Sequence, residues 1–151
     1  MKDLILHEED IFGLNIVLTK MIDESRMDCA LLINKSGRLV SAQSETSELD
    51  RTSLSALVTG TFTSSSSIAR LLGEEEFSCM VQEGEKKGLY VIMVDFNSIL
   101  ACVYDNRRTT LDKVKTIVPI HMESLKRGLT KIYENVMLDP ELNIDVSYYR
   151  G

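Results

Sequence analysis

The first hydrophobic pattern along the chain is helical. Between Glu8 and about Arg26, apolar residues recur every three or four positions, which places them on one face of a helix. The acidic run at residues 8–10 suits the positive N-terminal end of such a helix. We therefore predict an amphipathic helix whose inward positions are Ile11, Leu14, Leu18, Met21 and Ile22.

A short apolar run comes next and is followed by turn chemistry. Residues 29–33 are apolar at every position, and the run is too short for a helix. Residues 34–37 supply turn residues, and residues 38–42 form a second strand-like segment. The pattern predicts a β-hairpin. Because its first strand is apolar on both faces, we expect the sheet to be covered on both sides near its centre.

Residues 51–72 combine a helical apolar phase with a long run of hydroxyl side chains. Asp50 precedes the segment, and Gly73 is expected to end it. Residues 59–67 are poor in strong helix formers, so packing would have to hold them in a helix. We predict one helix, with a Ser-rich loop as the alternative. The positions that keep the helical phase are Leu54, Leu57, Val58, Ile68, Leu71 and Leu72.

Three strand-like segments and a last helix complete the predicted fold. Strands at residues 77–82, 89–94 and 99–104 are joined by short polar connections, which is typical of an antiparallel meander. Thr109 or Thr110 then caps a helix that continues to about Ile132. The predicted fold class is α+β, in the order α-β-β-α-β-β-β-α, with a central antiparallel sheet flanked by helices.

Composition narrows the classes of function. The chain has 151 residues and a formal charge of -6, and its basic pairs are scattered, which disfavours nucleic acid as a partner. No stretch approaches the roughly 18 to 20 apolar residues of a spanning helix, and the N-terminus lacks a signal-peptide core. We therefore predict a cytoplasmic protein without membrane insertion. Cys29, Cys79 and Cys102 lack CxxC spacing and are expected to be reduced, buried thiols.

No catalytic set assembles from the sequence. The histidines are His7 and His121, and neither has a nucleophile placed beside it by any pattern. The glycine-lysine loop at residues 84–88 joins two strands instead of opening a helix, so it does not match a phosphate-binding loop. No histidine or cysteine pair has the spacing of metal ligands. We predict no enzyme activity, no cofactor and no metal.

One side of the second helix is the candidate interaction surface. Most of its residues are small, and they lie opposite Leu54, Val58, Ile68 and Leu72, so a partner backbone could approach closely. We interpret this side as a contact surface, with a plain solvent face rich in hydroxyls as the alternative. Its residues are Thr52, Ser55, Ala56, Thr59, Thr63, Ser66, Ser67 and Arg70.

The element order resembles the roadblock domain of dynein light chains and their relatives, which has a profilin-like sheet. The residues that carry the resemblance are 30–41, 50–72 and 89–94. The domain would occupy residues 1–134, with a flexible tail at residues 135–151. The resemblance implies a homodimer in which second helices pair and third strands meet edge to edge. Phe77, Cys79 and Val81 would then belong to the dimer interface.

Within this family, the chain is most similar to the free-standing bacterial MglB-like branch. That branch implies a non-enzymatic regulator that stimulates GTP hydrolysis by a Ras-like GTPase, through its switch regions and without an arginine finger. A structural adaptor with no effect on nucleotide turnover is the alternative. A small-molecule sensor would need a pocket, whereas the densely apolar strands favour a packed interior. The implied partner-binding residues are Thr59, Thr63, Ser66, Ser67 and Arg70.

Overall fold

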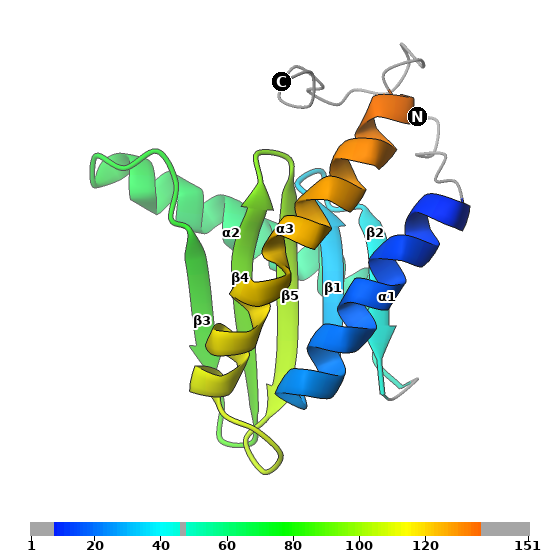
Figure 1. Cartoon of the computed structure of the whole chain (residues 1–151). Coiled ribbons are helices and arrows are strands. Elements are labelled where there is room, and N and C mark those ends of the chain that lie inside the picture. Colours follow the sequence, from blue (N-terminus) through cyan, green and yellow to red (C-terminus); the bar gives the residue numbers. More distant parts are fainter. Residues whose placement is uncertain (1–7, 46–47, 137–151) are drawn as a thin grey trace.

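The central feature is one antiparallel sheet of five strands, in the order β2-β1-β5-β4-β3. The structure is a computed structural model that describes residues 8–45 and 48–136, and the observed order of elements is the predicted one (Figure 1). The elements are α1 (Glu8–Ser25), β1 (Cys29–Asn34), β2 (Leu39–Ser44), α2 (Arg51–Leu71), β3 (Cys79–Glu83), β4 (Lys87–Asp95), β5 (Ser98–Asp105) and α3 (Leu111–Val136).

The predicted hairpin and meander are joined through β1 and β5. Their register places Cys29 opposite Val103 and Asn34 opposite Ser98. This pairing puts the most apolar strand at the interior of the sheet and leaves β2 and β3 as its edges. The predicted boundary between a domain at 1–134 and a tail at 135–151 stays a prediction. Helix α3 ends at Val136, and residues 137–151 lie outside the described part of the chain.

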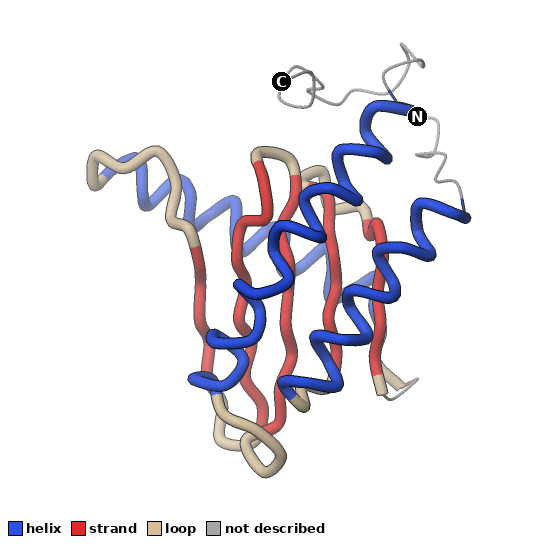
Figure 2. The backbone as a smooth tube through the Cα atoms, viewed as in Figure 1, coloured by secondary structure: helices blue, strands red, loops and turns tan. Residues whose placement is uncertain are grey.

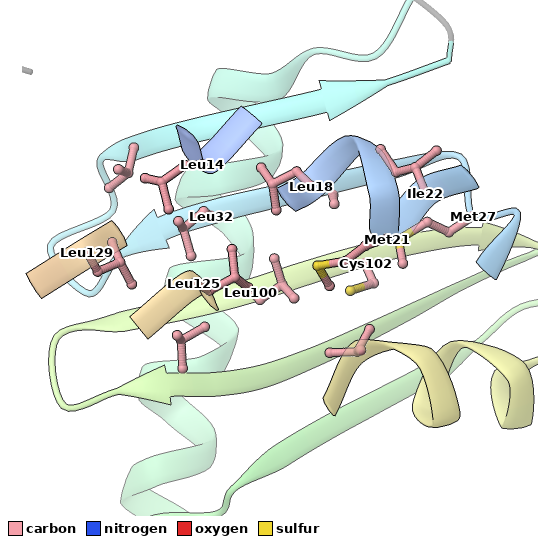
Figure 3. Close-up of a cluster of buried hydrophobic side chains, with 14 of the residues drawn as sticks. Leu14, Leu18, Met21, Ile22, Met27, Leu32, Leu100, Cys102, Leu125 and Leu129 are labelled. Atoms are coloured by element: carbon pink, nitrogen blue, oxygen red, sulfur yellow. The ribbon is translucent and has the colours of Figure 1, made fainter. Parts of the chain in front are cut away.

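Helices cover both faces of the sheet, as predicted from the apolar first strand. α1 and α3 lie on one face and α2 crosses the other (Figures 1 and 2). Every residue of β1 is buried, because its alternate side chains enter two different cores. The larger core, between the sheet and the α1–α3 pair, is drawn in Figure 3 and includes Leu14, Leu18, Met21, Leu32, Leu100, Cys102, Leu125 and Leu129.

A glycine allows the two helices on that face to approach closely. A Cβ atom at Gly128 of α3 would lie 2.5 Å from Cδ2 of Leu14 on α1. Within the sheet, Gly88 leaves room for the ring of Tyr104 on the neighbouring strand, since a Cβ at Gly88 would lie 2.1 Å from Cζ of Tyr104. Both positions exclude larger side chains because the neighbouring groups are buried and have little room to move.

α2 is one continuous helix, so the Ser-rich segment is not a loop. The side chain of Asp50 accepts a hydrogen bond from the Ser53 amide at 3.0 Å and caps the N-terminus. At the other end, Gly73 has a φ of 87°, and the amide of Glu74 reaches back to the carbonyl of Ala69 at 2.9 Å. The predicted terminator at Gly73 is thereby confirmed.

The three cysteines are free thiols in different surroundings. Cys29 and Cys102 are buried on opposite faces of the sheet, whereas Cys79 on the edge strand is only half-buried. Burial raises the pKa of Cys29 to about 11, which keeps this thiol protonated and unreactive near neutrality. Within the described residues, no helix is long and apolar enough to cross a membrane.

Candidate functional site

The side of α2 that faces the sheet is lined by small residues as well as large ones. Its buried residues are Ser55, Val58, Phe62, Ser66 and Ala69. The prediction that Ser55 and Ser66 lie on the outward side of this helix is therefore wrong. Their small side chains instead let the helix approach the sheet, and the Ser66 hydroxyl is satisfied by the Phe62 carbonyl at 3.1 Å.

A second side of α2, which we call the apolar flank, is exposed. Sequence periodicity predicted that Leu57, Ile68, Leu71 and Leu72 face inward, but 70%, 53%, 87% and 70% of their respective surfaces are accessible. The prediction is wrong because α2 carries two neighbouring apolar rows, and only the row at Val58 and its helical neighbours reaches the sheet. An exposed row of large aliphatic side chains is typical of a surface that binds another protein.

The third side of α2, which we call the polar flank, lines a pocket of about 160 Å³. Four of the five predicted partner-binding residues meet there: Thr59, Thr63, Ser66 and Arg70. The fifth, Ser67, is exposed and accepts a hydrogen bond from Arg70 at 3.3 Å. The structure thus brings most of the predicted set together, while partner binding by these residues stays a prediction.

The pocket also contains residues that were not predicted from the sequence as part of a site. Lys35, from the turn between β1 and β2, has its ammonium nitrogen 2.6 Å from Oε1 of Glu76. The same nitrogen lies 5.9 Å from the ring centroid of Phe62 and 5.3 Å from that of Phe96. The amide of Lys35 donates to the carbonyl of Asn97 at 2.8 Å. Lys35 is therefore held by contacts to α2, to the segment that follows α2 and to the turn between β4 and β5.

No single-sequence signal singled out Lys35 or Glu76. Lys35 appears as an ordinary turn residue, and Glu76 as the end of a solvated acidic run at residues 74–76. They meet because the folded chain brings the β1–β2 turn and the segment that follows α2 into contact across the sheet face that α2 covers. Such a contact spans 41 residues, so local periodicity carries no information about it.

The β3 edge is the second part of the candidate site. The family resemblance implied that Phe77, Cys79 and Val81 lie on an edge strand, and β3 is indeed an edge of the sheet. The strand begins at Cys79, so Phe77 precedes it by two residues. Val81 is partly exposed, while Cys79 packs against the core beneath α3. β3 pairs with β4 on one side, which leaves its other side open for pairing. Their role in a dimer stays a prediction.

An apolar groove lies beside the C-terminal end of β3, which is the end farthest from the C-terminus of α2. Two adjoining hollows of about 360 and 250 Å³ share Leu49, Lys87 and Val103. Leu54 of α2 and Leu89 of β4 supply further apolar wall. The groove exists because α2 packs mainly over β1 and β2 and leaves this part of the sheet less covered. Its lining residues were not predicted as a site.

Ion pairs fix the hairpin that borders this groove. The Lys87 ammonium lies 2.5 Å from Oδ2 of Asp28 and 3.4 Å from Oδ2 of Asp105. Arg107 also contacts Asp105, at 2.7 Å. Hydrogen bonds from Arg107 hold the pKa of the Asp105 carboxyl well below its usual range. These contacts tie the start of β4 to the residue that precedes β1 and to the end of β5.

Comparison with known proteins identifies the fold seen here. The family model for the roadblock/LC7 domain matches residues 15–104. The chain belongs to the roadblock/LC7 family. The roadblock sheet accounts for the arrangement above, in which α2 lies alone on one face and β3 at an edge. No curated protein sequence matches the chain at a significant level.

Solved structures place this roadblock domain in the MglB-like branch. MglB of Myxococcus xanthus is 31% identical, with a TM-score of 0.75 over 88% of this chain and 96% of that one. The gliding protein MglB of Thermus thermophilus is 28% identical, with a TM-score of 0.79 over 87% and 98%. Profilin II of Acanthamoeba castellanii, at 13% identity and a TM-score of 0.51 over 76% and 97%, shares the fold alone.

Proposed function

We propose that this roadblock protein is a homodimeric, non-enzymatic regulator that stimulates GTP hydrolysis by a Ras-like GTPase in the cytoplasm. The observation that carries the proposal is the division of α2 into an apolar flank and a polar flank. One flank suits a second copy of the chain, and the other suits a different partner. The GTPase itself is proposed from the similarity to MglB, whose branch implies that partner.

In the proposed dimer, the open β3 edges of two subunits pair about a two-fold axis. If two β3 strands pair antiparallel, the axis is perpendicular to the sheet and both α2 helices lie on the same face. In Figure 1, the C-terminal end of α2 extends past β3 at the edge of the sheet. In the dimer, that end would lie over the partner subunit. Leu71 and Leu72, at this end, would then lose their exposure to water.

The groove is placed to receive that helix end. The C-terminal end of α2 is connected to the start of β3, whereas the groove is bordered by Gln82 and Glu83 at the end of β3. Antiparallel pairing brings the start of one β3 beside the end of the other. Leu71 and Leu72 of one subunit would therefore meet the groove around Leu54 of its partner. The same contact would occur twice, once on each side of the axis.

This arrangement leaves the polar flank available. Leu54, on the same side of the helix as the apolar flank, borders the groove, whereas Thr59 and Thr63 border the pocket with Lys35. The partner helix would approach from the groove side, so the polar flanks of the pair would remain open to a GTPase. In that role the catalytic groups belong to the GTPase, and the regulator reorganises its switch regions by binding them.

The test combines oligomeric state with nucleotide turnover. The full chain should sediment as a dimer at micromolar concentration and should recover a Ras-like GTPase from cytoplasm of its source. Added to that GTPase, it should accelerate GTP hydrolysis, and a variant with Thr63→Arg should reduce the acceleration while remaining dimeric. A dimer that binds the GTPase without any change in turnover would instead establish the adaptor function.

A further inference from the structure

We propose that the pocket on the polar flank binds a carboxylate group of the GTPase, an Asp or Glu side chain held between Lys35 and Arg70. This inference rests on the proposed function and adds the chemistry of the contact. It depends on three properties of the pocket: its charge, the donors that remain unused, and its size.

The pocket is locally positive on an acidic protein. Its ionised lining residues are Lys35, Arg70 and Glu76, which together carry a formal charge of +1, whereas the chain as a whole carries -6. The Lys35–Glu76 pair is nearly neutral as a unit, so Arg70 supplies the excess charge. Among residues 8–45 and 48–136, no carboxylate lies within ion-pair distance of the Arg70 guanidinium.

The hydroxyl groups in the pocket have already used their hydrogens. Thr59 donates to the Ser55 carbonyl at 2.7 Å, and Thr63 donates to the Thr59 carbonyl at 2.9 Å. Ser66 donates in the same way to the preceding turn of α2. The donors that remain belong to the ammonium of Lys35 and the guanidinium of Arg70. These have three and five N–H groups, of which one points to Glu76 and one to Ser67. Both groups bind carboxylates through charge-assisted hydrogen bonds.

The volume argues for a single side chain as the occupant. The pocket holds about 160 Å³, whereas sites for drug-sized ligands and cofactors occupy roughly 300–1,000 Å³. A nucleotide is therefore too large, but a carboxylate on a short side chain fits. The acidic protein surface around the pocket repels carboxylates. Only a carboxylate that enters the pocket itself therefore gains from binding here. The contact would thus favour one orientation of the GTPase on the α2 surface.

The experiment measures the affinity of the recovered GTPase for charge variants of the full chain. We expect Arg70→Gln and Lys35→Met each to weaken binding by about tenfold to a hundredfold, while Arg70→Lys retains most of the affinity. Glu76→Gln should strengthen binding severalfold, because it removes the negative charge that competes for Lys35. This gain separates the proposed contact from damage to the fold, which sedimentation and thermal unfolding of each variant also monitor.

Arg127→Gln is the matched control. The Arg127 guanidinium contacts the Ser124 hydroxyl at 3.4 Å, much as Arg70 contacts Ser67, but it lies on α3 across the sheet. This variant should bind as the wild type does. Binding restored to Arg70→Glu by a GTPase with one acidic residue changed to lysine would identify the carboxylate.

The outcomes distinguish the inference from the function on which it rests. If the wild type binds no Ras-like GTPase, the proposed function is overturned and the inference falls with it. If the wild type binds but Arg70→Gln and Lys35→Met bind equally well, only the inference is overturned. A Glu76→Gln variant that weakens binding as much as Arg70→Gln would also overturn it.

Discussion

Replacing Leu71 by alanine should weaken the proposed dimer without harming the fold of the subunit. Leu71 is 87% exposed at the end of α2 that would lie over the partner. Removing its terminal carbons forfeits about 0.8 kcal/mol for each buried group, or ~2 kcal/mol for one side chain that becomes largely buried. A two-fold interface contains the contact twice, so the dimer loses ~4 kcal/mol. The dissociation constant should rise roughly a thousandfold if burial is complete, and about thirtyfold if it is half complete.

The stability of the subunit supplies the contrast. Because Leu71 makes little contact within its own chain, Leu71→Ala should change the free energy of unfolding of the monomer by less than ~0.5 kcal/mol. Leu125, which is fully buried on the inner side of α3, is the opposite case, and Leu125→Ala should cost about 2–5 kcal/mol. Phe12→Ala is the surface control, since Phe12 is 66% exposed on α1 across the sheet. It should leave the dimer unchanged.

Sedimentation velocity over a concentration series measures the dissociation constant, and urea unfolding of the dilute monomer measures stability. We expect Leu71→Ala to shift the monomer–dimer transition to higher concentration while the urea midpoint of the monomer stays constant. If Leu71→Ala dimerises like the wild type, the α2 end does not contact the partner, and the reasoning from its exposure is refuted. If Phe12→Ala dissociates instead, the dimer forms through the face that carries α1.

Three further changes test the packing and electrostatics. Gly128→Ala should destabilise the fold by about 1–3 kcal/mol in urea, because its Cβ would lie 2.5 Å from Cδ2 of Leu14. Gly60→Ala should stabilise it by up to ~1 kcal/mol, since no atom lies within 4 Å of a Cβ there. Arg107 lowers the pKa of Asp105, so the carboxylate stabilises the fold above its unfolded pKa of about 3.9 and loses this effect as the pH falls through its lowered folded pKa. Asp105→Asn should therefore be less stable than the wild type at neutral pH, with a difference that closes in acid unfolding.

The architecture could be predicted because its signals are local. The apolar run in β1, the short polar connections of the meander and the period of α1 each identify their element within a few residues. Even the Ser-rich part of α2 could be assigned, because the apolar phase continues across it. The pairing of β1 with β5 had no such signal, since it joins segments that are far apart in the chain, such as Cys29 and Val103.

The orientation of α2 shows where local patterns stop being informative. A hydrophobic phase reports which residues avoid water, but it does not say whether the sheet or a second protein covers them. For this reason, Leu57 and Ile68 were predicted to face the sheet. In the structure, Ser55 and Ser66 lie on the side of α2 that faces the sheet. Burial of Ser66 costs little because its hydroxyl hydrogen bonds the carbonyl of Phe62 in the preceding turn. Small residues therefore fill the side of α2 that packs on the sheet, and large apolar residues lie on a side that is exposed.

A helix with three differently composed sides can separate two functions that a simpler helix would mix. Val58 and its neighbours hold α2 on the sheet. Leu71 and Leu72 form the proposed surface for a second copy, and Arg70 supplies the proposed charge for another partner. Each surface depends on a different interaction, so substitutions should affect them independently. A Leu71→Ala variant that no longer dimerises keeps the charge on its polar flank. Measuring its binding would therefore show whether one subunit suffices to bind the GTPase. Retained binding with lost stimulation would mean that the pair of helices, and not the single pocket, acts on the switch regions.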